Sequence, residues 1–381
     1  MIRVLHTSDI HIGKVFEQFG SFGERLRRQI RETFRKILEL AVTEHVDAVL
    51  LAGDVFDSGR IAQGDITFFM EAVNSVKPTP VYLLPGTWTH DNFLQKPIYR
   101  SRYFSAGKPE NLEIFTKEEV ETFETASGQL AIHGRAVLPD SGNPLDGMRI
   151  DSQAAYKIGL LHIAVSLPQI PEEPGMCVLK REHLEGCGLI YLALGDWHVF
   201  RRYFEDAETV VQYSGSPETL QFKDGEDSGF VALVTFGSSP PQVEKRRVGY
   251  YRWKELNLLW ENVGSIEALK KQLAGLANPQ AILRLTLGGA ISEKQLFDLE
   301  RLKEEFSPQF AYLEFDTAQL KGKLTLEELE RTYRENTVER AFVTLVREAL
   351  QNAGNEQEAR GLREVLRRGH AVFQGFEEVV T

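Results

Sequence analysis

Aspartate and histidine residues recur along this chain at one kind of position, directly after a short apolar run that predicts a β-strand. In chain order, and with one threonine among them, the residues are Asp9, His11, Asp54, Thr89, His90, His162, Asp196 and His198. Side chains at the ends of separate strands meet in one cleft only if the strands share a sheet. The pattern therefore predicts an α/β fold built around a metal site.

Composition restricts the classes of protein to be considered. With 381 residues, 42% of them hydrophobic, the chain is long enough for two or three compact units of about 150 residues each. A formal net charge of −11 argues against binding nucleic acid through overall charge, so such contacts must be local. Cys177 and Cys187 are the only cysteines, which supports neither a disulfide framework nor a thiolate zinc site.

The N-terminus enters the strand-like run IRVLHTSDI without the apolar segment of a signal peptide. Elsewhere in the sequence, apolar runs stay well short of the ~20 residues that a membrane span needs. We therefore expect a cytoplasmic protein without a membrane partner, in keeping with the low cysteine content.

Changes in pattern along the chain predict three segments. Residues 1–250 alternate apolar runs with helical stretches, including an amphipathic helix over residues 23–45, which favours β-α-β crossovers. After the proline pair and charged run in SSPPQVEKRR, residues 251–322 form a smaller β-α-β pattern. Residues 323–381 are helical and charged, with apolar stripes that suit packing on a partner or on their own domain equally.

The donor set itself points to a reaction. Carboxylate oxygens suit hard divalent cations, whereas imidazole suits manganese, iron and zinc, so a mixed set favours a pair of transition-metal ions. Two such ions about 3.5–4 Å apart clamp a phosphate ester and activate a water molecule. Phosphoester hydrolysis is therefore the chemistry that the pattern suits best.

The order D-x-H, G-D-x-x-D, a G…H-D loop, a histidine after a strand and G-D-x-H resembles that of the calcineurin-like metallophosphoesterases. HTSDIHIGK and the later GSPE are most similar to the SbcD-type DNA double-strand-break repair nucleases in that superfamily. The resemblance implies a four-layer α/β/β/α sandwich over residues 1–250, a small β-α-β capping domain over 251–322 and C-terminal partner-binding helices over 323–381. It also implies a DNA exonuclease or endonuclease with two divalent ions, for which manganese is favoured and magnesium, iron and zinc are compatible.

The resemblance also implies roles for single residues. Asp9, His11 and His198 match the ligands of one metal, Asp54 the bridging carboxylate and His162 a ligand of the second metal. His90 matches the catalytic histidine that positions the phosphate and protonates the leaving group. Asp57 is expected instead to form local hydrogen bonds and not to bind a metal.

Two positions depart from the family pattern. Thr89 stands where asparagine is usual, and Asp196 stands where a histidine is usual, so both changes fall on the second metal. Both are expected to remain ligands of an altered or weaker site; a rival is a second metal that binds only with substrate. Two other functions stay open: a phosphodiesterase or phosphatase for small substrates, and a non-catalytic adaptor whose second site has decayed.

Basic and aromatic residues are the candidates for partner contacts. Arg100 and Arg102, flanked by Tyr99 and Tyr103, are placed to meet a DNA backbone or a stacked base. By resemblance, the C-terminal helices would dock on the coiled coil of an SbcC-like ATPase, and the protein would form a homodimer. Near the start of the predicted helix, a set of phenylalanines suits either that dimer interface or the core: Phe16, Phe19 and Phe22.

Overall fold

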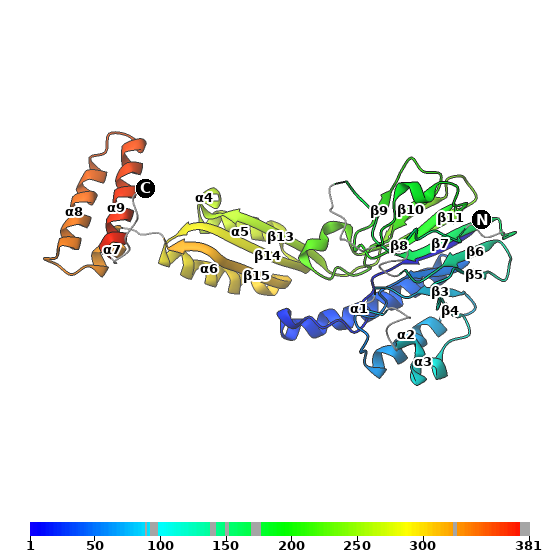
Figure 1. Ribbon diagram of the computed structural model, residues 1–381. Coiled ribbons are helices and arrows are strands. Elements are labelled where there is room, and N and C mark those ends of the chain that lie inside the picture. Colours follow the sequence, from blue (N-terminus) through cyan, green and yellow to red (C-terminus); the bar gives the residue numbers. More distant parts are fainter. Residues whose placement is uncertain are drawn as a thin grey trace. The chain divides into compact units, whose positions relative to one another are not determined.

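The computed structural model describes residues 1–87, 90–91, 98–137, 142–148, 152–168, 177–322 and 326–373 (Figure 1). The chain divides into two compact units, one of Met1–Lys254 with Gln280–Ile282, the other of Glu255–Pro279 with Leu283–Thr381. The roles assigned to the three predicted segments, and the division near residue 322, stay predictions. Within the described ranges, no helix combines the length and apolarity needed to cross a membrane.

Two six-stranded sheets form the first unit. In spatial order the first sheet contains β12 (Gln242–Arg247), β11 (Phe230–Phe236), β1 (Ile2–Thr7), β2 (Ala48–Ala52), β3 (Val81–Leu84) and β4 (Leu112–Ile114). The second contains β5 (Glu121–Glu124), β6 (Leu130–Gly134), β7 (Tyr156–His162), β8 (Tyr191–Gly195), β10 (Val210–Tyr213) and β9 (Arg201–Tyr203). Strands β1 to β4 are parallel, as are β6, β7, β8 and β10, so the carboxyl ends within each sheet share an edge.

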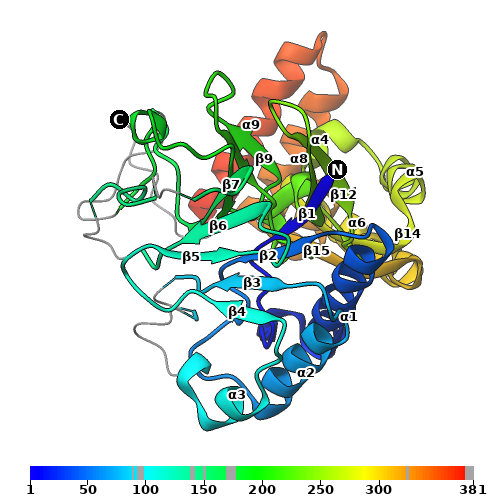
Figure 2. The same cartoon turned by 90° about the vertical axis from the view of Figure 1, so that its right-hand side faces the viewer.

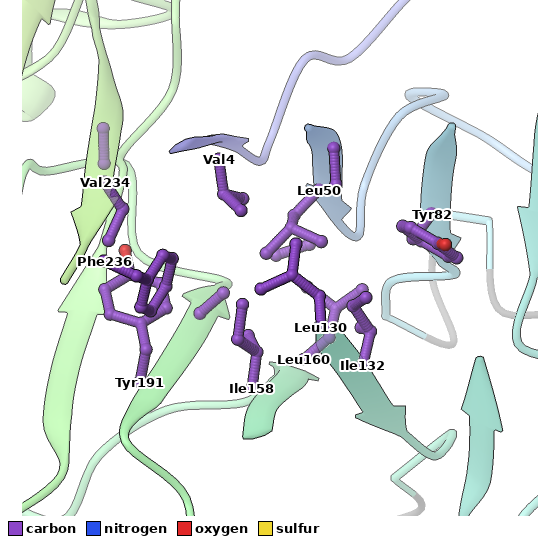
Figure 3. Close-up of a cluster of buried hydrophobic side chains, with 14 of the residues drawn as sticks. Val4, Leu50, Tyr82, Leu130, Ile132, Ile158, Leu160, Tyr191, Val234 and Phe236 are labelled. Carbon is purple, nitrogen blue, oxygen red and sulfur yellow. The ribbon is translucent and has the colours of Figure 1, made fainter. Parts of the chain in front are cut away.

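The main core lies between the two sheets (Figure 3). Strands alternate their side chains between two faces, so Val4 and Leu50 of one sheet meet Ile158 and Leu160 of the other. Each of these four side chains is fully buried, as expected for strands covered on both faces.

Helices cover the outer face of the first sheet: α1 (Ser21–Thr43), α2 (Gln63–Asn74) and α3 (Arg102–Gly107) (Figure 2). Phe34 of α1 stacks on Phe69 of α2 with ring centroids 5.6 Å apart, and Phe69 meets Phe104 of α3 at 6.2 Å. On the outer face of the second sheet, a separate apolar cluster joins Leu161 and Leu192 to loop residues such as Leu179. In the described residues this fourth layer is irregular, with the 3-10 helix η3 (Arg181–Leu184). The predicted α/β fold is confirmed.

The three phenylalanines near the start of α1 belong to the core of the first unit. Phe16, Phe19 and Phe22 are all buried within the single chain. Phe19 meets the Trp253 ring edge-on at 5.3 Å, and Phe22 meets the Tyr251 ring at 5.6 Å. Of the two roles open from the sequence, these contacts favour the core.

A three-stranded sheet characterises the next part of the chain, with β14 (Asn278–Ile291) between β13 (Arg252–Leu259) and β15 (Phe310–Gly322). Three helices accompany it: α4 (Trp260–Val263), α5 (Ile266–Leu276) and α6 (Glu293–Phe306). The predicted C-terminal helices are α7 (Leu326–Thr332), α8 (Val338–Gln351) and α9 (Glu356–Phe373). Leu329, Val343, Val346 and Leu366 form a small core among those three helices.

A buried glutamate ties α1 to the chain that follows β12. Glu218, in the GSPE run, is 2% exposed and accepts hydrogen bonds from the Thr33 hydroxyl at 2.7 Å and from the amides of Tyr250 and Tyr251 at 3.0 and 2.9 Å. Burial raises the pKa of Glu218 to about 7, although these hydrogen bonds and Arg247 act in the opposite direction. The folded protein therefore disfavours the ionised form of Glu218 relative to the unfolded chain.

This pKa predicts a pH-dependent effect of Glu218→Gln. Because the pKa is raised on folding, the contribution of Glu218 to stability is present below its unfolded pKa and lost as pH rises through about 7. The stability of the wild type relative to the variant should fall by about 1.4 kcal/mol per pH unit between about 4.5 and 7. Urea unfolding with EDTA at pH 5, 6, 7 and 8 measures it, with exposed Glu208→Gln as the control. A difference that is constant over this range would contradict the assignment.

Candidate metal centre

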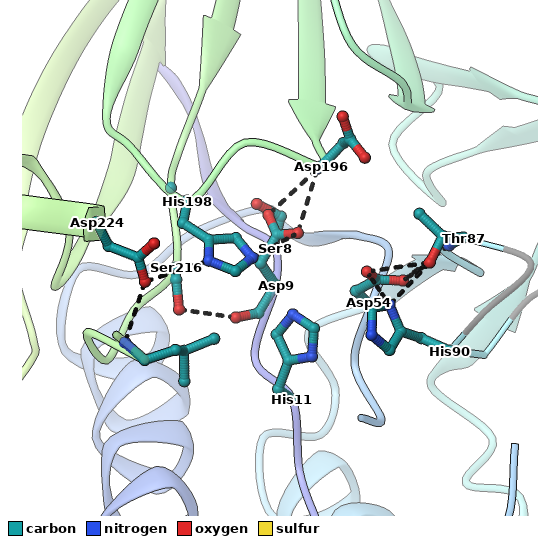
Figure 4. Close-up of polar contacts among 12 residues, drawn as sticks. Ser8, Asp9, His11, Asp54, Thr87, His90, Asp196, His198, Ser216 and Asp224 are labelled. Carbon is teal, nitrogen blue, oxygen red and sulfur yellow. Dashed lines mark hydrogen bonds and ion pairs between the residues drawn. The ribbon is translucent and has the colours of Figure 1, made fainter. Parts of the chain in front are cut away.

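The carboxyl-terminal ends of the strands in both sheets lie close together. The acidic and imidazole residues come directly after these strand ends (Figure 4). The backbone turns sharply there. Asp9, His11, Asp54 and Asp196 all have left-handed conformations, with φ of 51°, 54°, 48° and 99°. Such angles are uncommon for residues with a Cβ atom and cluster at functional sites, because surrounding structure must enforce them. The turns aim side chains from both sheets at one centre.

The first group of donors comprises Asp9, His11 and His198, whose ligand atoms all lie within 4.8 Å of one another. His198 Nε2 is 4.0 Å from Asp9 Oδ1, and the rings of His11 and His198 are 5.3 Å apart. The Nε2 atom of His11 is buried and has no hydrogen-bond partner in the described chain. A buried nitrogen facing carboxylates without a partner suits a metal ion.

A second group comprises Asp9, Asp54 and His162, again within 4.8 Å. His162 Nε2 lies 3.5 Å from Asp54 Oδ2 and 3.9 Å from Asp196 Oδ1, and it too is buried without a hydrogen-bond partner among the described residues. Asp9 belongs to both groups, so the two candidate ion positions are adjacent. The donor chemistry and the two orphaned nitrogens fit a pair of divalent ions.

Electrostatics in the second group follow from burial and close opposite charge. Burial alone would raise the pKa of Asp54, but the charge and hydrogen bonds of His162, with the hydrogen bond of His90, hold it well below its ordinary range. Burial alone would lower the pKa of His162, yet Asp54, Asp9 and Asp196 raise it well above its usual value. The carboxylates thus favour a positive charge at His162 Nε2, a charge that a bound cation would supply.

The other nitrogen of each imidazole is held by a neighbouring group. His11 Nδ1 donates to Asp57 Oδ1 at 3.0 Å, and His162 Nδ1 to the Ala52 carbonyl at 2.7 Å. His198 Nδ1 donates to Asp224 Oδ2 at 3.3 Å. These bonds fix ring orientation and point Nε2 to the centre. Asp57 thus makes the expected local hydrogen bond, whereas no sequence motif marked Asp224.

The loop after β3 brings a fourth imidazole to the centre. His90 Nδ1 donates to Asp54 Oδ2 at 2.7 Å and lies 2.8 Å from the Thr87 hydroxyl. The Thr87 amide donates to Asp54 Oδ1 at 2.7 Å, and its hydroxyl is 3.3 and 3.4 Å from the two carboxylate oxygens. Thr89, the predicted ligand, lies outside the described residues. Thr87 was not singled out from the sequence.

A buried carboxylate holds this loop against β2. Asp91 is fully buried and accepts hydrogen bonds from the Gly86, Val55 and Phe56 amides at 2.6, 2.9 and 3.2 Å. The Tyr99 hydroxyl donates a fourth at 2.7 Å. Four donors on one carboxylate link the turn after β2 to the His90 loop and so position both.

Tyr99, which flanks the predicted DNA contacts Arg100 and Arg102, is buried and donates its hydroxyl to Asp91, so its ring does not offer a face to a nucleic-acid base. The residues that follow Tyr99 in the chain are more exposed. Arg100 and Arg102 are exposed, and Tyr103 keeps 49% of its surface accessible with the Arg102 guanidinium 5.6 Å from its ring centre. The exposed pair Arg102 and Tyr103 therefore keeps the combination of charge and ring that the sequence suggested.

Two glycines allow the close approach of backbone and ligands. A Cβ atom on Gly195 would lie 1.8 Å from the Ala52 carbonyl oxygen and 2.6 Å from His162 Nδ1. One on Gly86 would lie 1.9 Å from Asp54 Oδ1. The absence of a side chain at each position is thus a condition for the donor geometry.

Known proteins are similar to long stretches of this sequence. The family model described as calcineurin-like phosphoesterase matches residues 2–162. An uncharacterized metallophosphoesterase YhaO of Bacillus subtilis is 28% identical over 276 residues, which cover 68% of this chain and 62% of that protein. A DNA double-strand break repair protein Mre11 of Methanosarcina mazei is 24% identical, covering 65% of this chain and 38% of its own length.

A shorter match is to a subunit of the nuclease SbcCD of Escherichia coli, 34% identical over 92 residues, which cover 24% of this chain and 22% of that protein. The chain thus spans less than two thirds of the length of each of these relatives.

Gly195→Ala tests the close approach at the centre. Since the added methyl group would overlap a backbone carbonyl and the His162 ring, the variant should be less stable by about 1–3 kcal/mol and bind metal more weakly. Thermal unfolding with and without Mn²⁺ measures both effects. Gly64→Ala, where a Cβ atom meets nothing within 4 Å, is the matched control. Equal behaviour of the two variants would contradict the role of Gly195.

Proposed function

Because its residues 2–162 place this chain in the calcineurin-like metallophosphoesterase superfamily, we propose that it is a metal-dependent nuclease that hydrolyses the phosphodiester bonds of DNA. One observation carries the proposal: the two groups of carboxylate and imidazole donors share Asp9, and His90, whose side chain is 30% exposed, contacts Asp54 of the second group. That arrangement suits in-line displacement at a phosphate ester.

We assign one set of donors to each ion. Asp9, His11 and His198 would hold one ion, and Asp54, His162 and Asp196 would hold the second, with Asp54 as the carboxylate between the two. Two divalent ions bound there would polarise the phosphate and lower the pKa of a water molecule. Manganese is the cation that we propose, since it accepts both carboxylate and imidazole donors.

Thr87 is proposed as a further ligand of the second ion. Its hydroxyl lies as close to Asp54 Oδ2, at 3.4 Å, as His162 Nε2 does at 3.5 Å, so both donors border one position. Thr87 also directly follows Gly86 near the start of the loop after β3. This placement offers a hydroxyl where the family motif indicates Thr89.

His90 is proposed to protonate the leaving oxygen. Burial alone would lower its pKa, but the hydrogen bond and charge of Asp54, with Asp57 and Asp91, raise it above the ordinary value and favour the acid form. Nδ1 is engaged by Asp54, so Nε2 would face the substrate. The side chain is 30% exposed, which gives a phosphate access.

DNA is proposed as substrate over small esters because two relatives are named as DNA repair or nuclease proteins. Arg100, Arg102 and Tyr103 are then proposed to contact the DNA backbone or a base. Homodimer formation and docking on an SbcC-like ATPase are part of the same proposal. For the ATPase, α8 and α9 offer exposed Leu345, Val365 and Val372.

Cleavage assays test the substrate class. The purified protein should cut labelled single- or double-stranded DNA with Mn²⁺ and not with EDTA, and Asp54→Asn should lower the rate at least about 100-fold, since it removes the bridging charge. Asp227→Asn, with an exposed carboxylate, is the control.

Cleavage of bis(p-nitrophenyl) phosphate but not of DNA would indicate a phosphodiesterase for small substrates. If neither substrate is cut, and mass spectrometry finds fewer than two metal ions per chain, the non-catalytic adaptor is supported instead.

Calorimetric titration with Mn²⁺ tests the ligand assignment. Thr87→Ala should weaken the second binding event about tenfold, while Thr87→Asn, which supplies an amide oxygen, should retain it. Thr89→Ala is the matched comparison and should leave both events unchanged. If Thr89→Ala weakens the second event and Thr87→Ala does not, the family motif rather than this geometry identifies the ligand.

A further inference from the structure

A hollow of about 390 Å³ lies at the opposite edge of the sheets from the metal centre. Residues just before or at the amino ends of β2, β3 and β4, among them Asp47, Pro80 and Asn111, line one side. The end of β5 and the turn after it, including Phe123 and Ser127, line the other. The metal ligands instead follow the carboxyl ends of their strands, so the hollow is separate from the centre.

The polar lining of this hollow accepts hydrogen bonds and carries negative charge. Four carboxylates contribute, from Asp47, Glu110, Glu113 and Glu124, and the lining residues of the described chain include no lysine, arginine or histidine. Acidic residues alone are common on protein surfaces. The neutral hydroxyl of Tyr82 among them is less ordinary.

Tyr82, at the edge of the core in Figure 3, is 3% exposed and lines the hollow, and its hydroxyl makes no hydrogen bond with another described residue. Burial, together with the charge of Glu113, raises the pKa of Tyr82 to about 12, so the hydroxyl stays neutral. The hydroxyl oxygen itself faces the hollow, because Tyr82 lines it and this oxygen is not among the buried atoms without a partner. A ligand in the hollow can therefore form a hydrogen bond with it.

Asn111 helps to form the wall of the hollow. Its side-chain nitrogen donates to the carbonyls of Val73 and Thr79 at 3.0 and 2.9 Å, which fixes the orientation of the amide. The Oδ1 atom is left buried without a hydrogen-bond partner in the described chain, and Asn111 lines the hollow. The Tyr82 hydroxyl and the negative rim favour a ligand with several donors and a positive charge.

The apolar part of the lining specifies the rest of the ligand. The Tyr82 and Phe123 rings lie 6.0 Å apart at 35°, and Pro78 and Pro80 stand beside them. Aromatic faces attract organic cations, and an aliphatic stem is favourable against proline and ring carbons. A hydrated inorganic cation gains nothing from such walls.

From these features we propose that the hollow is a binding site for an organic cation, a guanidinium or alkylammonium group on an aliphatic stem. The cation donates to Glu113 and to the Tyr82 hydroxyl, and its stem covers Phe123. The source is either a free polyamine or a basic side chain of a peptide, since both carry this chemistry.

Two lysines at the rim modulate the site. Lys108 Nζ lies 3.7 Å from Glu113, and Lys77 Nζ lies 3.1 Å from Glu110, in pairs whose side chains are at least one third exposed. Exposed pairs of this kind contribute little stability and exchange readily. A ligand cation therefore competes with Lys108 for Glu113.

The test is NMR titration of the full chain carrying ¹³C-labelled tyrosine, with the Tyr82 signal identified by its loss in Tyr82→Phe. Spermidine and Nα-acetyl-arginine methylamide are the two cationic probes, and the isosteric, neutral Nα-acetyl-citrulline methylamide is the control. Saturable movement of the Tyr82 signal with either cation, and not with citrulline, supports the site. The tighter probe then identifies the source.

Two single substitutions test which charges at the rim affect binding of the cation. Glu113→Gln should weaken binding about tenfold, because it removes a charge-assisted hydrogen bond. Lys108→Ala should strengthen it about two- to fivefold by removing the competing cation. Both positions are partly exposed, so thermal unfolding should stay unchanged and exclude misfolding. A Tyr82 signal unmoved by both cations, equal effects of arginine and citrulline derivatives, or unchanged affinity in Glu113→Gln would each overturn the proposal.

Discussion

The hydrogen bond from His162 Nδ1 to the carbonyl of Ala52 joins the end of β7 in one sheet to the end of β2 in the other. Metal ligands from both sheets can meet only while that junction holds. Gly195 packs on the same carbonyl, where any Cβ atom would overlap it, and the turn after β2 then directs Asp54 toward His162 Nε2. The positions of the metal donors thus depend on the contact between the Ala52 carbonyl and the His162 ring, although no carboxylate takes part in that contact.

This junction has an energetic consequence. It brings Asp9, Asp54 and Asp196 together in a largely buried space, where like charges repel and desolvation disfavours each ionised form. Burial raises the pKa of Asp196 to about 6, which shows how unfavourable a further negative charge is there. Cations that bind among these carboxylates would relieve the repulsion, so metal binding and stability of the first unit are coupled.

The sequence predicted the strand ends and most donors, because apolar runs followed by Asp or His are local patterns. The residues that position these donors could not be predicted from the sequence. Asp91 and Asp224 act through partners that only the folded chain brings near, and Tyr99 has a neighbour that no spacing reveals. Thr87 was not singled out for a related reason: motif alignment counts residues, whereas the contact of the Thr87 hydroxyl with Asp54 depends on the path of the loop.

The C-terminal helices show the same limit. A stripe of period 3.6 predicts that one helix face is covered without specifying by what. In the structure Val343, Val346 and Leu366 cover one another, whereas Leu345 and Val365 stay exposed on the same helices. An apolar stripe can therefore divide its residues between an internal core and an outward face. Since the core needs no partner, substitutions at the exposed positions can separate docking from folding, which substitutions in the core cannot do.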